Sequence, residues 1–217
     1  MIKSKYVGAS IGGIATKISN YARRRMFATL MRLAQPTEET TVLDVGVTCD
    51  RRLDSNFFEK LYPYPHKITA VGLEDASFLE VEYPGLKFVQ TDGLRLPFPD
   101  KSFDLAVSFA VLEHVGDRAQ QRTFIHELCR VSRACCITTP NRWFPIEFHT
   151  VLPLIHWLPP NFFRWILNHT GKNFWAKEEN LNLLGQKELL SLFSSDRITC
   201  YHHKLLGLVS NLFVYKN

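Results

Sequence analysis

Two periodicities of apolar residues alternate along the chain. Short runs rich in apolar and β-branched residues predict seven strands, at residues 41–46, 67–73, 87–90, 103–109, 134–138, 197–203 and 210–216. Segments with apolar residues every three or four positions predict helices, at residues 14–34, 51–62, 117–132 and 186–194. Strands that alternate with helices in this way indicate an α/β fold with a mainly parallel sheet.

The first predicted helix stands apart from the strand–helix alternation. Its apolar residues fall close to one face, at Ile18, Ala22, Phe27, Leu30 and Leu33 or Ala34. Pro36 follows and ends the helix. We therefore expect an N-terminal helical extension over residues 1–38, which covers a ligand or mediates dimerisation, and a main domain over 39–217. The sequence gives no indication of the oligomeric state.

The composition is typical of one folded domain and leaves the α/β interpretation unchanged. The 217 residues are 46% hydrophobic and 22% charged, with a formal net charge of +5. The one dense basic run, Arg23-Arg24-Arg25, is typical of a solvated helix face, with a phosphate or membrane surface as the alternative. The N-terminus has no secretory pattern and no long apolar window occurs, so we expect a cytoplasmic protein.

The five cysteines are expected to be free thiols. No CxxC spacing occurs among them, so the sequence predicts no metal site. Cys135 and Cys136 are adjacent within a predicted buried strand, and their side chains should point to opposite faces of the sheet.

Acidic residues end or follow three successive predicted strands. Asp44 ends the first strand, Glu74 follows the second and Asp92 follows the third. Ligands of open parallel sheets bind at the carboxyl ends of the strands, where an acidic side chain can hold the hydroxyl groups of a ribose. The alternative for each residue alone is a helix N-cap. The three together favour a nucleoside-like ligand.

The segments TVLDVG, ITAVGLEDAS and VQTDGLRLPFPDKSFDLAVSFAVLEHV resemble the class I S-adenosylmethionine-dependent methyltransferases. The resemblance runs from about residue 40 to 140 and is nearest to the type 11 group, which includes ubiquinone-pathway and sugar-pathway enzymes. It implies a Rossmann-like, seven-stranded, mainly parallel sheet with helices on both faces. It also implies methyl transfer from S-adenosylmethionine to a small-molecule acceptor, with S-adenosylhomocysteine as product.

Residue by residue, the resemblance implies a cofactor site and a neighbouring catalytic site. Cofactor contacts fall to Asp44 and Gly46 (methionine part), Glu74 (ribose), Asp75, Asp92 and Gly93 (adenine), and Ser108 and Phe109 (beneath the cofactor). Glu113 and His114 would lie near the path of the methyl group.

One loop departs from the family pattern D/E-x-G-x-G-x-G. This chain has DVGVTCD at residues 44–50, so two of the three glycines are replaced. Thr48 could bind the amino-acid end of the cofactor and Asp50 its ammonium group. The alternative is a non-catalytic partner or binding protein with a degenerate methyltransferase fold.

The segment after residue 140 is rich in aromatic residues and prolines. We expect residues 140–185 to form an insert that acts as a lid and binds the acceptor. The tail TTPNRWFPIEFHTVLPLIHWLP also resembles a small bacterial subgroup associated with surface-polysaccharide gene clusters. An oxygen or carbon acceptor would need a general base, for which His114, His149 and His156 are candidates, with a purely structural histidine as the alternative for each.

The sequence also bears on three other kinds of partner: a membrane, nucleic acid and a nicotinamide cofactor. A peripheral membrane contact is a lesser expectation, through Trp143, Phe144, Trp157 and Trp165 with Arg142 and Arg164. Nucleic acid is not expected, because no extended basic patch and no N-P-P-Y-like motif occur. A nicotinamide oxidoreductase is disfavoured because the loop lacks the G-x-G-x-x-G glycines.

Overall fold

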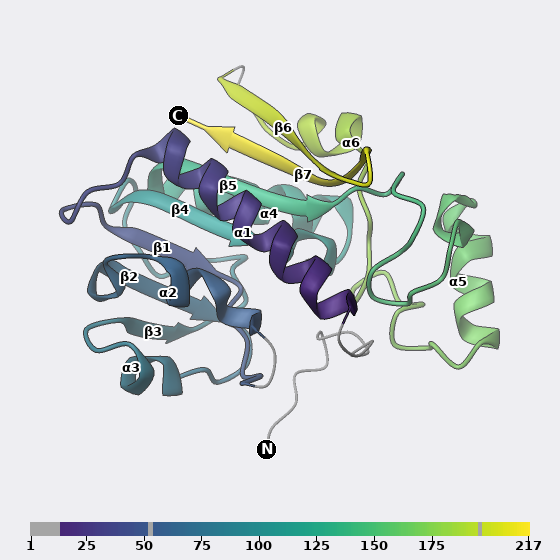
Figure 1. Ribbon diagram of the computed structural model, residues 1–217, viewed down its shortest axis with the longest axis horizontal. Helices are drawn as coiled ribbons and strands as arrows, with labels where there is room; N and C mark the ends of the chain where they lie inside the picture. The colour runs from purple at the N-terminus through teal and green to yellow at the C-terminus, as the bar shows by residue number, and fades with distance from the viewer. Residues whose placement is uncertain (1–13, 52–53, 195–196) are drawn as a thin grey trace.

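The computed structural model describes residues 14–51, 54–194 and 197–217. Its centre is a seven-stranded sheet in the order β3-β2-β1-β4-β5-β7-β6 (Figure 1). The strands are β1 (Val42–Val45), β2 (Ile68–Gly72), β3 (Lys87–Gln90), β4 (Phe103–Phe109), β5 (Ser132–Pro140), β6 (Ile198–Leu205) and β7 (Leu208–Lys216). The sheet is mixed: the first five strands pair in parallel, whereas β7 is antiparallel to both β5 and β6.

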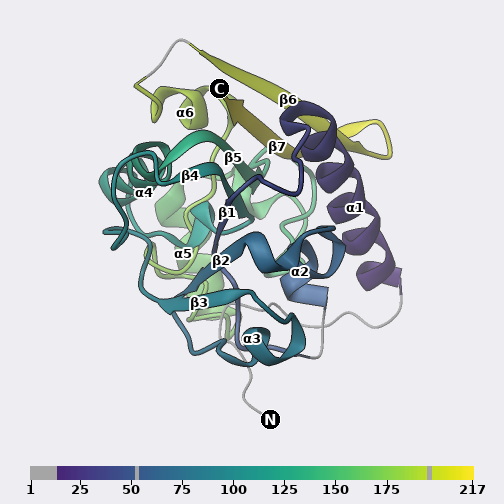
Figure 2. The same ribbon diagram turned by 90° about the vertical axis from the view of Figure 1, so that its left-hand side faces the viewer.

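Helices cover both faces of the sheet (Figure 2). One face packs against α1 (Ile14–Ala34), α2 (Phe57–Leu61) and α3 (Phe78–Glu82), and the other against α4 (Arg118–Val131) and α6 (Gln186–Ser191). Each layer closes over a core of apolar side chains, so the sheet is buried on both sides as a parallel sheet requires. None of the described helices is long and apolar enough to cross a membrane.

Two adjacent cysteines show how β5 divides the core. Cys135 packs in the cluster with Phe124 and Leu128 of α4, whereas Cys136 packs in the cluster with Leu30 of α1. Successive side chains of a strand point to opposite faces, and the prediction for this pair is confirmed.

The expected helices differ from those observed mainly in length. The N-terminal helix is present, but its most buried side chains are Met26 and Leu30, while Ile18 and Ala22 are half-buried. The predicted helix at 51–62 is shorter: a 3₁₀ turn at Asp54–Asn56 leads into α2, and residues 52–53 lie outside the described residues. The short helix α3 was not predicted, because five residues are too few to show a helical period.

The chain from residue 141 to 185 lies beyond the carboxyl ends of the strands (Figure 1). It contains α5 (Pro160–His169) and a 3₁₀ turn at Ile155–Trp157. It has a small apolar cluster of its own, made of Phe163, Leu167, Ala176, Leu181 and Leu183. The segment is therefore packed independently of the sheet faces; its role as a lid stays a prediction, as does the division of the chain at residue 38.

Candidate functional site at the carboxyl ends of the strands

The strand order of the sheet changes direction between β1 and β4. β1 pairs in parallel with β2 on one side and with β4 on the other. The loops that leave the carboxyl ends of these two strands diverge, and ligands of open α/β sheets bind at such a point. The loop after β1 and the turns after β2, β3 and β4 all meet at this edge, called here the cofactor edge.

Gly46 turns the chain sharply where β1 ends. Its φ of 121° lies in a region that side-chain-bearing residues rarely adopt, and a Cβ at this position would collide with the side chain of Val111. The backbone amides of Gly46 and Val47 both donate to the carbonyl of Val71, at 2.7 and 3.1 Å. One glycine of the family pattern is thus retained where the backbone needs it.

Side-chain hydrogen bonds hold the rest of this loop. The Asn56 side chain forms two hydrogen bonds with the backbone of Thr48: it accepts from the N–H and donates to the C=O, each at 2.9 Å. The Thr48 hydroxyl accepts from the amide of Asp50 at 3.2 Å. These contacts fix a conformation that glycines would otherwise leave free, and Asn56 was not identified from the sequence.

The loop also reaches the acidic residue after β2. The Cys49 thiol donates to a carboxylate oxygen of Glu74 at 3.2 Å. Burial and the Glu74 carboxylate raise the pKa of Cys49 to about 11, so the thiol keeps its proton at neutral pH. The substituted loop is therefore connected to Glu74, the residue expected to bind a ribose.

Asp44 faces the interior below the loop. It is buried, and it lies next to the buried carboxyl group of Glu59 from α2. Burial, with the neighbouring Glu59, raises the pKa of Asp44 well above its usual value, and burial likewise raises the pKa of Glu59. Two carboxyl groups in one dry site disfavour ionisation of both at once, which favours a protonated carboxyl group here. Direct contact of Asp44 with a ligand stays a prediction.

Replacing Glu59 with Gln is expected to stabilise the fold at neutral pH. Because both folded-state pKa values are raised, the folded state binds protons more tightly, and stability is lost as pH rises through these raised values. Gln removes one ionisable group at nearly constant volume, so a gain on the order of 1 kcal/mol is expected at about pH 8 and less at about pH 5.

Urea unfolding at both pH values tests this expectation. Glu179→Gln, an exposed carboxylate, is the matched control and should leave the midpoint unchanged. A Glu59→Gln midpoint below that of the wild type at about pH 8 would contradict the buried-pair interpretation.

The acids after β2 and β3 form similar turns. Asp75 accepts from the amide of Ser77, and Asp92 from the amide of Leu94, each at 2.9 Å. The hydrogen bond from Ser77 lowers the pKa of Asp75, so this carboxylate stays charged. Gly93 has a φ of 76°, and a Cβ there would lie 2.7 Å from the ring of Phe124. Both Asp side chains are exposed, and neither caps a helix.

The end of β4 is buried. The Ser108 hydroxyl donates to the carbonyl of Val45 at 2.9 Å and links β4 to β1. Phe109 contacts the rings of Phe57 and Phe58 from α2, with centroids 5.0 and 5.9 Å away. These two predicted cofactor residues form the floor of the cofactor edge, and their direct contact with a ligand stays a prediction.

Glu113, His114 and His149 come together beside the cofactor edge; we call them the His–His–Glu cluster. The Nε2 atoms of the two histidines lie 3.1 Å apart. His114 Nδ1 donates to the carbonyl of Asn180 at 2.6 Å, and His149 Nδ1 donates to Glu147 at 2.7 Å. The structure thus brings together three catalytic candidates that the sequence named separately. Their catalytic role stays a prediction, and Glu147 and Asn180 were not identified from the sequence.

Burial and charge set the protonation of this cluster. Burial and the neighbouring His149 lower the pKa of His114 to about 3, while burial raises the pKa of Glu113 to about 7. Burial alone would lower the pKa of His149, but the Glu147 carboxylate raises it above its usual value. His149 in turn lowers the pKa of Glu147 to about 2, despite its burial. His114 is therefore a neutral imidazole with its lone pair on Nε2.

The 3₁₀ turn Leu112–His114 is fixed from several sides. The side-chain amide of the buried Gln121 donates to the backbone carbonyls of Leu112 and Asn182, each at 2.9 Å. The backbone amide of Asn182 donates to the backbone carbonyl of Glu113 at 2.7 Å. The Trp175 ring lies 4.9 Å from His149 and 5.7 Å from His114, centroid to centroid. Residues 175–182 therefore form one wall of the cluster.

The third histidine candidate lies apart from this cluster. His156 is buried, and its Nε2 donates to the carbonyl of Phe144 at 2.8 Å. This hydrogen bond fits the alternative stated for His156, a purely structural histidine.

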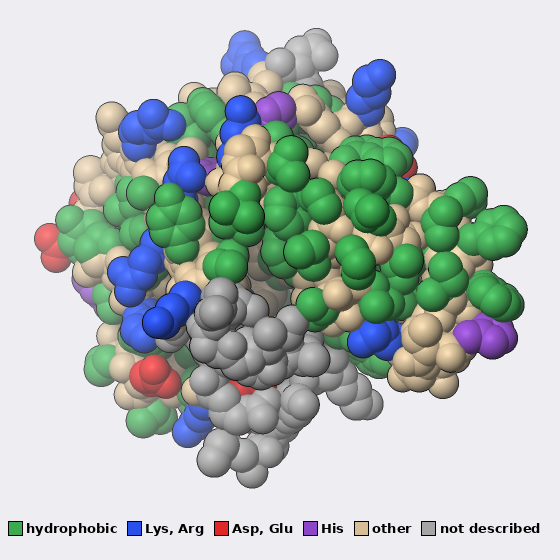
Figure 3. Space-filling view, turned by 45° about the vertical axis from the view of Figure 1, so that its right-hand side comes forward, with side chains coloured by type: hydrophobic (Ala, Val, Ile, Leu, Met, Phe, Trp, Pro, Cys, Tyr) green, Lys and Arg blue, Asp and Glu red, His purple; other side chains and the backbone are tan. Residues whose placement is uncertain are grey.

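Aromatic side chains are exposed on the segment that follows β5. Trp143, Trp157, Phe162 and Trp165 are 56%, 40%, 64% and 58% exposed, and Figure 3 shows hydrophobic side chains gathered on this part of the surface. Phe144, expected among them, is buried against Phe148 instead, so it cannot belong to an exposed contact face. Membrane contact through the others stays a prediction.

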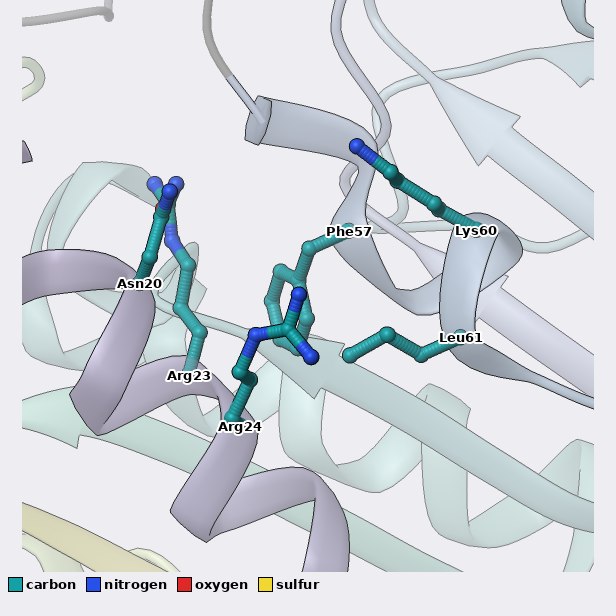
Figure 4. Close-up of a pocket in the computed structure, with 6 residues that line it drawn as sticks. All are labelled: Asn20, Arg23, Arg24, Phe57, Lys60 and Leu61. Atoms are coloured by element: carbon teal, nitrogen blue, oxygen red, sulfur yellow. The ribbon is translucent and has the colours of Figure 1, made fainter. Parts of the chain in front are cut away.

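A small basic pocket lies between α1 and α2. Its cavity volume is about 20 Å³, and it is lined by Arg23 and Arg24 of α1 and by Phe57, Lys60 and Leu61 of α2, with Asn20 (Figure 4). The Arg23 guanidinium lies 5.6 Å from the centre of the Phe57 ring. Ligand pockets usually enclose roughly 300–1,000 Å³. The pocket is thus too small to hold a whole cofactor.

The comparisons with known proteins agree with this arrangement. Residues 55–134 match the family described as "Methyltransferase domain". This part of the chain is similar to a methyltransferase domain. The matched residues run from α2 to β5, so they include Glu74, Asp92, Glu113 and His114. The narrower ubiquinone- or sugar-pathway group stays a prediction.

Similar proteins extend the match beyond the methyltransferase domain. A probable S-adenosylmethionine-dependent methyltransferase of Mycobacterium tuberculosis is 31% identical over 130 residues, which cover 58% of this chain and 44% of that protein. The chain thus spans less than half the length of that relative. A similar protein of Mycolicibacterium smegmatis is 30% identical over 138 residues, 61% of this chain and 50% of the relative.

Solved structures share the fold at low sequence identity. The PH0226 protein of Pyrococcus horikoshii aligns with a TM-score of 0.59 at 13% identity, covering 96% of this chain and 93% of its own. An S-adenosylmethionine-dependent methyltransferase of Methanosarcina mazei aligns with a TM-score of 0.52 at 19% identity, covering 85% and 94%. The Rossmann-like α/β fold expected from the sequence is confirmed, with a mixed sheet.

Proposed function

We propose that the protein transfers a methyl group from S-adenosylmethionine to a small-molecule acceptor. The observation that carries this proposal is the cofactor edge: the Gly46 turn, Glu74 and the Asp92–Gly93 turn follow three adjacent parallel strands. Glu74 and the Asp92–Gly93 turn lie within the residues that are similar to a methyltransferase domain. When bound, the cofactor supplies an activated methyl group, and the chain has to align the acceptor and exclude water.

The residues at the cofactor edge fit this cofactor. The half-buried Glu74 carboxylate can accept hydrogen bonds from both ribose hydroxyls, and the exposed Asp92 carboxylate, beside Gly93, can accept one from the adenine amine. Gly46 allows the tight turn, closed by Val111, that aims the loop at the expected position of the methionine part. S-adenosylmethionine has no pyrophosphate, so a glycine-rich anion cradle is needed less than in dinucleotide proteins. The proposed set is completed by Asp44, Thr48, Asp75, Ser108 and Phe109.

Glu113, His114 and His149 are proposed to bind the acceptor, with Trp175 as an aromatic wall. The segment after β5 would close over the bound acceptor. A surface-polysaccharide sugar or another metabolite is the acceptor class that the sequence resemblance favours, in a cytoplasmic enzyme without a nucleic-acid substrate. The alternative of a non-catalytic partner rests only on the two replaced glycines, and the comparisons do not support it.

Replacing Glu74 with Gln tests the proposal. The wild type is expected to bind S-adenosylmethionine and S-adenosylhomocysteine in a calorimetric titration. Gln accepts fewer hydrogen bonds and has no charge, so an affinity loss of about 10- to 100-fold is expected for both.

The matched control is Glu82→Gln, an exposed carboxylate on α3, which should bind both ligands like the wild type. A folded wild type that binds neither ligand would overturn the proposed function, and equal binding by Glu74→Gln would remove Glu74 from the site.

A further inference from the structure

The His–His–Glu cluster has three potential metal-ligand atoms close together. One nitrogen from each of His114 and His149 and one oxygen of Glu113 all lie within 4.8 Å of one another. They come from two parts of the chain, the turn after β4 and the segment after β5. Such convergence of two imidazoles and a carboxylate is typical of sites for divalent transition metals.

Glu113 has an unusual position for a carboxylate. It is fully buried, and its Oε2 accepts from the Thr139 hydroxyl at 3.0 Å. Its Oε1 has no hydrogen-bond partner among the residues that the structure describes. A buried carboxylate oxygen without a partner costs free energy, unless a ligand satisfies it.

The two histidines are held as metal ligands are. His114 Nδ1 donates to the Asn180 carbonyl, and His149 Nδ1 donates to the Glu147 carboxylate, so both Nε2 atoms point towards each other. A histidine ligand usually donates its other N–H to a carboxylate or a carbonyl in this way. The buried Glu147 carboxylate also accepts from the backbone amides of His149 and Thr150.

The separation of the two nitrogens fits one shared ion. At a metal–nitrogen distance of ~2.1 Å, the observed 3.1 Å corresponds to an angle of about 95° at the ion. This is near the right angle between neighbouring ligands of an octahedron. Two histidines and one carboxylate on one side of an ion leave its other positions open.

We propose that Glu113, His114 and His149 bind a first-row divalent transition-metal ion. Two imidazole ligands favour such an ion over Mg²⁺ or Ca²⁺, which prefer oxygen. The inference revises the expectation of no metal, which rested on cysteine spacing alone. Binding of the ion is independent of the proposed methyl transfer. If that function also holds, the open positions would take an oxygen of the acceptor and lower its pKa, which would aid O-methylation.

The test is a calorimetric titration of the full chain, purified without a histidine tag and dialysed against a chelator. Mn²⁺, Co²⁺ and Zn²⁺ are added separately, and the visible spectrum of the Co²⁺ form reports nitrogen ligands directly. We expect one ion per chain for at least one metal. Glu113→Gln and His149→Gln should each weaken it by at least about 100-fold, and Glu147→Gln by about 10- to 100-fold.

Controls separate this site from adventitious binding and from misfolding. His202→Gln removes an exposed histidine and should bind the ion like the wild type. Circular dichroism identifies the variants that fold. No binding by the folded wild type, or equal binding by folded Glu113→Gln or His149→Gln, would overturn the proposal and leave a hydrogen bond between the histidines. Titration of the metal-free protein with S-adenosylmethionine is a separate readout, so either proposal can fail alone.

Discussion

Replacing Gly46 with Ala is expected to weaken S-adenosylmethionine binding by at least about 100-fold and to destabilise the fold. The φ of 121° is strained for alanine, at roughly 1–3 kcal/mol, and the added Cβ would meet the side chain of Val111. Relief of either conflict moves the loop that leaves β1. Calorimetric titration with the cofactor and urea unfolding measure the two effects.

Two further variants separate strain from collision. In Gly46→Ala with Val111→Ala, the two γ-carbons are removed and only a tight contact with the Cβ of residue 111 is left beside the strain, so part of the stability should return. Gly171 has a φ of 72° and nothing within 4 Å of the position of an added Cβ, so Gly171→Ala shows strain alone, away from the cofactor edge. Unchanged cofactor affinity in Gly46→Ala would show that the loop does not approach the ligand.

Replacing Phe124 with Ala is expected to cost about 3–5 kcal/mol of unfolding free energy. Phe124 is 1% exposed on α4 and packs in the core with Leu43 and Ala106. Its ring also lies directly beneath Gly93, so the cavity would loosen the Asp92–Gly93 turn. Cofactor affinity should therefore fall in the fraction that stays folded. Urea unfolding measures the first effect and calorimetry the second.

Phe162→Ala is the matched control, since this phenylalanine on α5 is 64% exposed. Its midpoint should stay within about 0.5 kcal/mol of the wild type. A similar loss in both variants would mean that the two rings contribute equally, which contradicts the assignment of Phe124 to the core.

The sheet was predictable because most of its strands are short runs of buried residues; the edge strands β3 and β6 are more exposed. The alternation of side chains even placed Cys135 and Cys136 in different cores. The strand order was not visible in the same pattern, since pairing of β7 between β5 and β6 depends on contacts far apart in the sequence. The helix α3 was not predicted for a local reason, because five residues are too few to show a helical period.

The candidate site was predictable in part for similar reasons. Glu74 and Asp92 directly follow strands, so the topology of a parallel sheet places them at one edge. By contrast, Glu59 lies on a helix that follows the loop, and only the fold brings it to Asp44. Asn180 is 66 residues from its partner His114, and no periodicity links the two. Contacts of this kind are set by tertiary packing.

The position of β7 has a consequence for synthesis on the ribosome. β6 comes first in the chain, but among the described strands its only neighbour in the sheet is β7, which also covers the outer edge of β5. Until residues 208–216 have emerged, the backbone groups along this edge of β5 have no strand to pair with, and β6 has nowhere to dock. An unpaired strand edge can recruit another chain. A nascent chain paused in this interval would therefore be the form most exposed to aggregation and most dependent on chaperones.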